Sequence, residues 1–298
     1  MTILAEGVRR ITCANPSPMT HTGTQSYLVG SGALALIDPG PELPAHRAAL
    51  LAALTPGERI AAILVTHSHR DHSAGTAALA EATGAPVYAF GPHGAGMSRT
   101  MQRLAADGLS GGGEGADAGF RPDHRLGDGE TLAVGAARLT ALHTPGHLSN
   151  HLCFALEGTG LLFTGDTVMG WSSTLVSPPE GDMAAFMASL ARLAERAEAG
   201  ADRRYLPGHG APVEEPAALL AEQRAHREAR AAQVLAALPD AGASAPELTA
   251  EVYADTDPRL HPAATRNLFA TLVWLAEAGR VEPEGAIGTG TRFRRLGP

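Results

Sequence analysis

The sequence predicts an α/β protein whose helices and sheets form separate layers. Two observations support this class. In the first half of the chain, short apolar runs alternate with Ala- and Leu-rich helical patterns, as they do in βαβ units. In addition, 44% of the 298 residues are hydrophobic and 18% are charged, so the chain can bury a large core and general disorder is excluded.

The first half of the chain supplies the elements that define this class. Residues 60–65 form a continuous apolar run, which is typical of a strand buried on both faces. The Gly-Ser-Gly sequence at 30–32 separates two shorter apolar runs and predicts a turn between two strands. The expected elements are strands at 25–29, 33–37, 60–65 and 86–90, and helices at 44–54 and 73–83.

The second half continues with short strands that are punctuated by glycine, and then an amphipathic helix. Between the two halves, residues 108–119 carry six glycines and little that could pack, which predicts a mobile loop. The expected elements are strands at 131–134, 138–142, 152–156 and 160–164, a helix at 183–199 and a short strand that ends near Tyr205.

The last third predicts a small separate domain. An Ala/Glu/Arg-rich helix is expected at 216–238, followed by a linker of Pro, Gly, Ser and Ala at 239–245. Two helices at 246–253 and 262–278 and a hairpin within 280–296 would complete it. This order is that of a winged-helix module, and a structural tail packed on the main domain is the alternative. The predicted division is 1–215, 216–238 and 239–298.

Composition excludes several classes of protein. Two cysteines cannot form a disulfide framework or a thiolate-rich zinc site. A net charge of −8 disfavours binding to nucleic acid through bulk electrostatics. The first residues do not look like a secretory signal, and no run of about 18 apolar residues could span a membrane. We therefore expect a cytoplasmic protein that does not contact a membrane.

The 13 histidines are the unusual feature of the composition, and they point to a metal site. Thr66-His-Ser-His-Arg-Asp-His72 directly follows the apolar run at 60–65 and places His67, His69, Asp71 and His72 within six residues. Imidazole nitrogens and carboxylate oxygens at a strand-to-helix junction suit Zn²⁺, and also iron or manganese.

Three further candidates lie at comparable strand exits. His147, Asp166 and His209 each follow an expected strand, and each is directly preceded by glycine. Glycine allows the backbone to turn tightly and to approach a bound group closely. Each of these three motifs is a weak signal alone. Together with the segment 66–72, and in this order, they form a specific signal.

Together these residues resemble the metallo-β-lactamase superfamily of hydrolases, over roughly residues 20 to 215. The resemblance implies an αββα sandwich of four layers with two divalent cations at one edge. It also implies a ligand set: His67, His69 and His147 for the first cation, Asp71, His72 and His209 for the second, and Asp166 bridging both.

Within this superfamily the chain is most similar to the lactamase-β-like branch, whose members carry a C-terminal winged-helix-like extension. The segment 165–174, the segment 205–213 leading into a long charged helix, and residues 261–281 carry this similarity. The implied activity is hydrolysis of an ester-type or phosphodiester bond by a hydroxide that bridges two metal ions. Asp71 is the candidate catalytic residue, because it could steer the proton of the nucleophile while ligating. Zn²⁺ is the first choice of metal, with iron or manganese as alternatives.

The substrate is left open by the sequence. A small ester, thioester or phosphoester is one class, and glyoxalase-II-like thioester hydrolysis is one form of it. Single-stranded RNA is another, since Ser172, Ser173 and Thr174 could donate to a phosphate. The net charge and an aromatic content of 4% argue against RNA. A non-enzymatic metal-binding module is disfavoured because no ligand is missing.

The other histidines receive supporting roles. His143 and His151 are expected to support the metal site rather than to bind metal, whereas His46 is taken as a surface or packing residue. The helix at 216–238 would pack either on the sandwich or on a second subunit in a homodimer, and its pattern does not decide between them.

Overall fold

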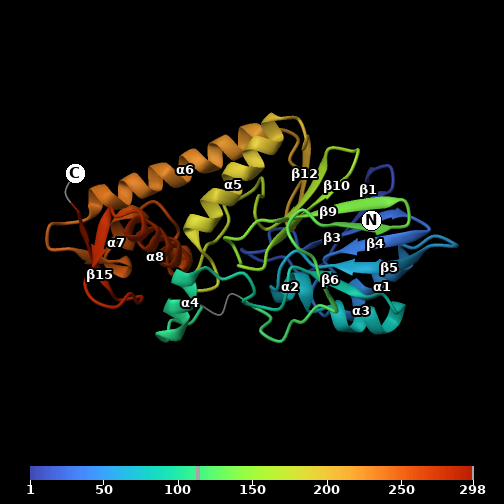
Figure 1. Ribbon diagram of the computed structural model, residues 1–298, viewed down its shortest axis with the longest axis horizontal. Helices are drawn as coiled ribbons and strands as arrows, with labels where there is room; N and C mark the ends of the chain where they lie inside the picture. Colours follow the sequence, from blue (N-terminus) through green and yellow to red (C-terminus); the bar gives the residue numbers. More distant parts are fainter. Residues whose placement is uncertain (112–114, 297–298) are drawn as a thin grey trace.

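Two β-sheets packed face to face form the centre of the protein in the computed structural model, which describes residues 1–111 and 115–296 (Figure 1). The strands of the first sheet are adjacent in chain order: β1 (Thr2–Ala5), β2 (Val8–Thr12), β3 (Gln25–Ser31), β4 (Ala33–Ile37), β5 (Arg59–Leu64), β6 (Val87–Ala89) and β7 (His124–Arg125). The second sheet contains β8 (Thr131–Val134), β9 (Ala137–His143), β10 (Leu152–Leu156), β11 (Leu161–Gly165) and β12 (Arg204–Pro207), which are adjacent in the order β12-β11-β10-β9-β8.

An apolar layer fills the space between the two sheets. Ile37 and Leu64 of the first sheet belong to the same buried cluster as Phe154 of the second. Tyr27 and Phe163 meet edge to face across the layer with ring centroids 5.0 Å apart. The inward side chains of both sheets are thus withdrawn from water, which is the main source of stability for such a sandwich.

Helices cover the two outer faces of the sandwich. α1 (Pro44–Ala52) and α3 (Thr76–Thr83) pack on the first sheet, where Leu50 and Leu79 join its outward side chains. α5 (Met183–Glu198) and α6 (Pro216–Ala237) cover the second sheet, where they contribute Phe186 and Leu220. The result is the four-layer αββα sandwich, and the predicted fold class is confirmed.

The C-terminal region has its own core at the far end of α6 (Figure 1). It contains α7 (Ala245–Val252), a 3₁₀ turn at Pro258–Leu260, α8 (His261–Glu277) and a sheet of β13 (Ala243–Ser244), β14 (Val281–Pro283) and β15 (Arg292–Arg295), with β15 in the middle. This is the predicted winged-helix arrangement. The apolar face of α6 is buried within the chain, since Leu220 contacts the sandwich core and Leu235 contacts the C-terminal core.

The structure corrects the sequence interpretation at several elements. β1, β2, β7 and α4 (Arg99–Ala106) were not expected, and the linker predicted at 239–245 contains β13, which pairs with β15. The helix predicted at 73–83 is instead two helices, α2 (Arg70–Ser73) and α3. The break occurs at Gly75, whose N–H donates to Gly40 and where a Cβ would lie 3.0 Å from two backbone oxygens.

The structure describes both ends of the loop predicted at 108–119. Residues 112–114 lie outside the described residues. Gly115 accepts a hydrogen bond from the backbone N–H of Arg70, and Asp117 donates to the backbone oxygen of Ser68. This end of the loop therefore runs beside the histidine-rich segment that follows β5.

Candidate metal centre

The candidate ligands meet where several strands end at one edge of the sandwich. β5 is parallel to β4 in the first sheet, and β12 is parallel to β11 in the second. Parallel neighbours end at the same edge, so the residues that follow them are brought together. The histidine-rich segment follows β5, Asp166 follows β11 and His209 follows β12. His147 comes from the loop between β9 and β10.

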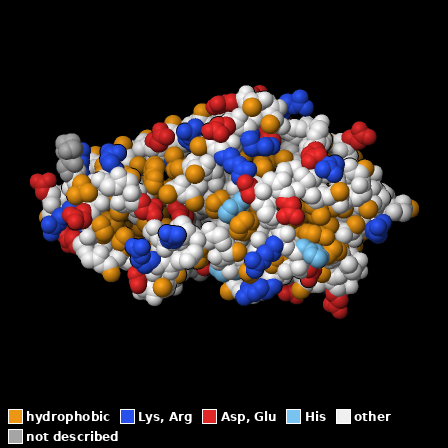
Figure 2. Space-filling view, in the orientation of Figure 1, with side chains coloured by type: hydrophobic (Ala, Val, Ile, Leu, Met, Phe, Trp, Pro, Cys, Tyr) orange, Lys and Arg blue, Asp and Glu red, His pale blue; other side chains and the backbone are white. Residues whose placement is uncertain are grey.

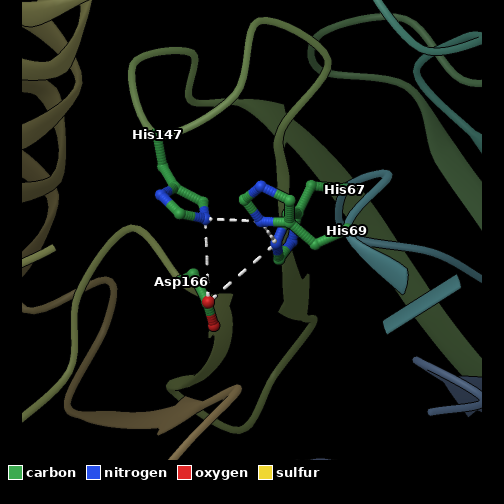
Figure 3. A group of neighbouring side chains, drawn as sticks. All are labelled: His67, His69, His147 and Asp166. Carbon is green, nitrogen blue, oxygen red and sulfur yellow. Dashed lines mark hydrogen bonds and ion pairs between the residues drawn. The ribbon is translucent and has the colours of Figure 1, made fainter. Parts of the chain in front are cut away.

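Seven side chains form two neighbouring groups, each with its ligand-type atoms within 4.8 Å of one another. We call the first the His147 group and the second the His72 group. Figure 3 shows the first, in which the three imidazoles and the carboxylate point toward one centre. The His147 group contains His67, His69, His147 and Asp166, and the His72 group contains Asp71, His72 and His209.

The imidazole nitrogens face each other at short distances. In the His147 group, Nδ1 of His69 lies 3.0 Å from Nε2 of His67 and 2.9 Å from Nε2 of His147. In the His72 group, Nε2 of His72 lies 3.3 Å from Nε2 of His209. These rings are at least nine-tenths buried, so their facing nitrogens have little access to bulk water.

In four of the five rings, the nitrogen opposite the centre has a partner that fixes its proton. Nδ1 of His147 donates to the backbone oxygen of Leu175 at 2.8 Å, and Nδ1 of His72 donates to Asp38 at 2.8 Å. Nδ1 of His209 faces the backbone oxygen of Gly23 at 3.4 Å. In its neutral form, with the proton on Nδ1, each of these four rings would turn the lone pair of its Nε2 toward the centre, as a metal ligand requires.

Asp38 organises this shell from the end of β4. Its carboxylate accepts hydrogen bonds from the N–H and the hydroxyl of Thr66 and from His72, all at 2.8 Å. Because the Thr66 hydroxyl donates to Asp38, it must accept from Nδ1 of His67, which lies 3.0 Å away. One buried carboxylate therefore sets the proton positions of two rings. The sequence interpretation missed Asp38, because Asp-Pro-Gly after a strand indicates a turn.

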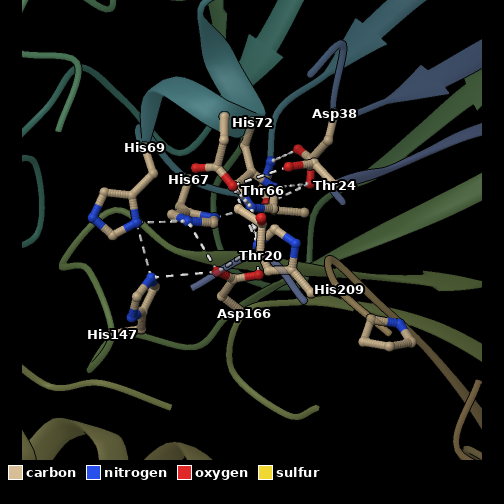
Figure 4. Close-up of polar contacts among 12 residues, drawn as sticks. Thr20, Thr24, Asp38, Thr66, His67, His69, His72, His147, Asp166 and His209 are labelled. Atoms are coloured by element: carbon tan, nitrogen blue, oxygen red, sulfur yellow. Dashed lines mark hydrogen bonds and ion pairs between the residues drawn. The ribbon is translucent and has the colours of Figure 1, made fainter. Parts of the chain in front are cut away.

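Asp166 lies between the two groups (Figure 4). Its Oδ2 is 3.7 Å from His147 and 3.3 Å from His209, and its Oδ1 is 3.4 Å from His72. Oδ1 is buried and has no hydrogen-bond partner among the described residues. A buried carboxylate oxygen without a hydrogen bond, amid inward-facing imidazole nitrogens, fits the coordination of divalent cations.

Glycines allow this close approach. A Cβ at Gly208 would lie 2.3 Å from Oδ1 of Asp166 and 2.6 Å from His72. A Cβ at Gly165 would lie 2.6 Å from His151, and the backbone there has a positive φ of 47°. The glycines that precede Asp166 and His209 are thus required by space and, at Gly165, also by conformation.

The two groups differ in charge. Burial lowers the pKa of His67 and His147, and it lowers that of His69 to about 3. Burial also opposes protonation of His72 and His209. The carboxylates of Asp71 and Asp166 outweigh it at both rings, so the pKa of His72 is well above its usual value and that of His209 is about 9. A metal cation would compete with these protons for the same carboxylates and nitrogens.

The comparisons with known proteins identify the family of the domain that carries this site. The family model described as metallo-beta-lactamase superfamily matches residues 19–209. The chain belongs to the metallo-β-lactamase superfamily. It is a hydrolase of this superfamily with a cluster of metal-binding histidines and aspartates. A second model, the beta-lactamase-associated winged helix domain, matches residues 244–290 and agrees with the C-terminal fold.

Relatives resemble this superfamily member over most of their length. The lactamase-like protein vrtG of Penicillium aethiopicum is 33% identical over 94% of this chain and 85% of its own. The atrochrysone carboxyl ACP thioesterase of Aspergillus chevalieri is 33% identical over 78% of this chain and 65% of its own.

Solved structures show the same architecture. A beta-lactamase domain protein from Burkholderia ambifaria superposes with a TM-score of 0.80 at 25% identity, over 99% of this chain and 93% of that chain. TTHA1623, solved in a di-iron-bound form, superposes with a TM-score of 0.51 at 29% identity, over 70% and 95% of the two chains.

The residues predicted to support the centre of this metallo-β-lactamase superfamily member occupy different places. His151 accepts from the N–H of Asp166 at 3.1 Å and stacks on His67. The buried hydroxyl of Thr174 donates to the backbone oxygen of Asp166 at 2.6 Å. His143 instead faces the backbone oxygen of Ser149 and stacks on the Phe90 ring. Ser172 and Ser173 are exposed and line a different depression, beside α6.

A cavity of about 400 Å³ opens onto the ligands. Its wall combines apolar side chains with the carboxylates of the site and of Glu180, while Arg70 contributes a positive charge. This volume suits a small organic molecule or the end of a longer one. The described residues that line it are Met19, Thr20, His69, Arg70, Asp71, Gly115, His147, Leu148, Asp166, Leu175, Ser177, Glu180 and His209.

No helix in the described part of the chain is both long and apolar enough to cross a membrane.

Proposed function

We propose that this protein hydrolyses a small substrate with an ester-type bond, thioesters above all, at two divalent cations. The observation that carries the proposal is the convergence of two buried ligand groups at a cavity, with the Nε2 atoms of four imidazoles turned inward. His67, His69 and His147 would hold one cation, Asp71, His72 and His209 the second, and Asp166 both.

The chemistry of such a pair of cations is general. When bound, two neighbouring divalent cations lower the pKa of water and polarise the oxygen of the group under attack. The nitrogen and oxygen ligands suit Zn²⁺ best, with iron or manganese as alternatives. Support for a pair comes from the di-iron-bound TTHA1623.

Asp71 is suited to handle the proton of the attacking water. Its side chain is 28% exposed and lines the cavity, whereas the other carboxylate, that of Asp166, is 10% exposed. One of its oxygens accepts from the Thr24 hydroxyl at 3.0 Å, which restricts rotation of the carboxylate. Asp71 can therefore point one oxygen toward the substrate while it keeps its contacts to His72 and His209.

The cavity favours a small acyl substrate over a polyanion. Met19, Leu148 and Leu175 supply apolar surface for an acyl group, whereas Glu180 would repel a phosphate chain. On the face seen in Figure 2, basic and acidic side chains are interspersed and do not form a continuous basic band. The relative named as an acyl-carrier-protein thioesterase supports the thioester over other small substrates.

The decisive experiment is a hydrolysis panel. Acyl thioesters, oxygen esters, lactones, phosphodiesters and a fluorescent single-stranded RNA would be tested with protein reconstituted with Zn²⁺, Mn²⁺ or Fe²⁺. We expect turnover of thioesters with about two metal ions per chain. An Asp166→Asn variant serves as the matched control and should lose that turnover.

Two results would contradict the proposal in different ways. Cleavage of the RNA with all thioesters and esters intact would reject the substrate class but keep the metal centre. Wild-type protein that retains no metal after reconstitution and buffer exchange would reject the metal centre itself.

A further inference from the structure

We propose that Arg227 and Asn267, on two C-terminal helices, are positioning residues that hold the orientation of His147 in the metal centre. The inference rests on the proposed function, because it takes His147 as a metal ligand. It assigns to the C-terminal region a part in building the hydrolytic site. The link is the stretch of chain at 174–177, called the brace loop below.

The brace loop has no regular secondary structure, yet three of its backbone groups form hydrogen bonds with side chains that are far away in the sequence. The oxygen of Thr174 accepts from the guanidinium of Arg227. The oxygen of Leu175 accepts from Nδ1 of His147 at 2.8 Å. The N–H of Val176 donates to Oδ1 of Asn267 at 2.9 Å. The acceptor that orients His147 is thus held on both sides by side chains of α6 and α8.

Arg227 is an unusual residue to bury for packing alone. It is 6% exposed, and in the described part of the chain its charge meets carbonyl and amide oxygens and the Phe186 ring rather than a carboxylate. Burial lowers its pKa only to about 10, so it stays charged at neutral pH. Burying a cation without a counter-ion is costly, whereas a methionine would fill similar space at no such cost. What the cation adds is directed hydrogen bonds to the brace loop.

Asn267 connects the winged-helix domain to the same loop. It lies on α8, and its Oδ1 also faces Nη1 of Arg227 at 3.4 Å, so the two braces are joined. The neighbouring Arg266 donates to the hydroxyl of Ser177 at 3.1 Å, and Ser177 lines the cavity. The winged-helix domain therefore reaches the brace loop through two adjacent residues, and one of them, Arg266, contacts a residue of the cavity wall.

The expected consequence is a change in the metal site rather than a general loss of folding. Without its braces, the Leu175 oxygen would move and the His147 ring could rotate away from the other ligands. Loss of a partner that orients a metal-binding histidine typically lowers metal affinity about 10- to 100-fold.

Four full-length variants separate this role from simple stabilisation. Arg227→Met and Asn267→Leu remove the braces at similar volume, whereas Asn267→Asp keeps an acceptor for the Val176 N–H. Arg230→Met is the matched control, because Arg230 lies one turn further along α6, donates to the Val252 oxygen and stacks on Tyr253, away from the brace loop.

The measurement is a Co²⁺ titration followed by visible absorption, with thermal unfolding in parallel. We expect Arg227→Met and Asn267→Leu to bind Co²⁺ about 10- to 100-fold more weakly, with an altered spectrum. Asn267→Asp and Arg230→Met should retain the wild-type affinity and spectrum, even where Arg230→Met lowers the unfolding temperature. If Arg227→Met does not fold, the pair at Asn267 carries the test.

The outcomes that overturn the inference are distinct from failure of the proposed function. Wild-type affinity and spectrum in both Arg227→Met and Asn267→Leu would reject the brace, whatever happens to their stability. Equal weakening in Asn267→Leu and Asn267→Asp would also reject it, because the acceptor would then be irrelevant. Wild-type protein that takes up no Co²⁺ would instead overturn the metal centre and, with it, this inference.

Discussion

Two histidines, one in each half of the candidate metal centre, are held by different parts of the molecule. In the His72 group, His72 is held by Asp38, a carboxylate at the end of a buried strand that also binds Thr66. In the His147 group, His147 is held by a carbonyl oxygen in a loop without secondary structure, and that loop depends on α6 and α8. Strand ends of the sandwich therefore suffice to orient His72, whereas in the proposed arrangement the orientation of His147 depends on side chains of α6 and α8.

The largest effect is expected from removing Asp166, which lies between the two groups. Asp166→Ala should abolish measurable hydrolysis, by more than about 10³-fold, because loss of a mere orienting partner already costs about 10- to 100-fold. Metal analysis should show less than one tightly held ion per chain. A variant that kept two ions and its activity would show that Asp166 is not shared between the groups.

A narrower change should affect the His72 group more than the His147 group, because Asp38 contacts His72 directly but reaches His67 only through the Thr66 hydroxyl. Asp38→Asn removes the charge that faces Nδ1 of His72, while asparagine tolerates the positive φ of 52° at this position. We expect metal affinity to fall about 10- to 100-fold at this half. Isothermal titration should then resolve two sites, of which the one at the His72 group is weakened more. Equal weakening of both would mean that Asp38 supports the centre as a whole.

A smaller effect is expected at Thr24, which holds a carboxylate that water can reach. Thr24→Val keeps the shape of the side chain and removes the hydroxyl that donates to Asp71. Because Asp71 is 28% exposed, water can replace this hydrogen bond in part. We expect kcat to fall by about tenfold, which is the lower end for a partner of an active-site group. Unchanged kcat would remove Thr24 from the site.

The smallest effect on metal binding is expected at His46, which should instead affect the pH dependence of stability. His46 lies on α1 and is buried against Ser26. Burial lowers its pKa to about 4, below the value of about 6.5 in an unfolded chain. The unfolded state therefore binds more protons between pH 6.5 and 4, and stability is lost as the pH falls through this window, by on the order of 3 kcal/mol.

Denaturant unfolding at pH 7 and at pH 4.5 tests this expectation. The wild type should lose more stability than His46→Gln between the two pH values, while the metal affinities of the two proteins at pH 7 agree. The other buried histidines are common to both proteins, so their contributions cancel. Parallel losses of stability would show that His46 does not titrate as described.

Much of the fold was predictable because its elements carry local patterns. The strand expected at 33–37 and that expected at 131–134 have the predicted bounds, and the ligand candidates lie together because each follows a strand. β1 and β2 were missed because they are short, and β2 contains Arg9 and Arg10 beside its apolar residues. The break at Gly75 was missed because its cause is a contact with residues 39–41, far away in the sequence.

The support of the centre was much harder to predict. Asp38 carries no signal beyond a common turn motif, and its role depends on three donors from another strand end. Arg227 lies in a helix rich in arginine and glutamate, where a solvated face is the natural expectation. Such residues are defined by tertiary packing, so a spacing pattern along one segment cannot indicate them.

Both cysteines are buried, and burial raises the pKa of the Cys13 thiol to about 11 and that of Cys153 to about 12. Thiolates, not thiols, attack disulfide reagents, so neither side chain should react quickly in the folded protein. A chromogenic disulfide reagent can therefore report the thiol that thioester cleavage releases, with little background from the enzyme and without blocking it. Cys13 and Cys153 therefore need not be substituted before such an assay.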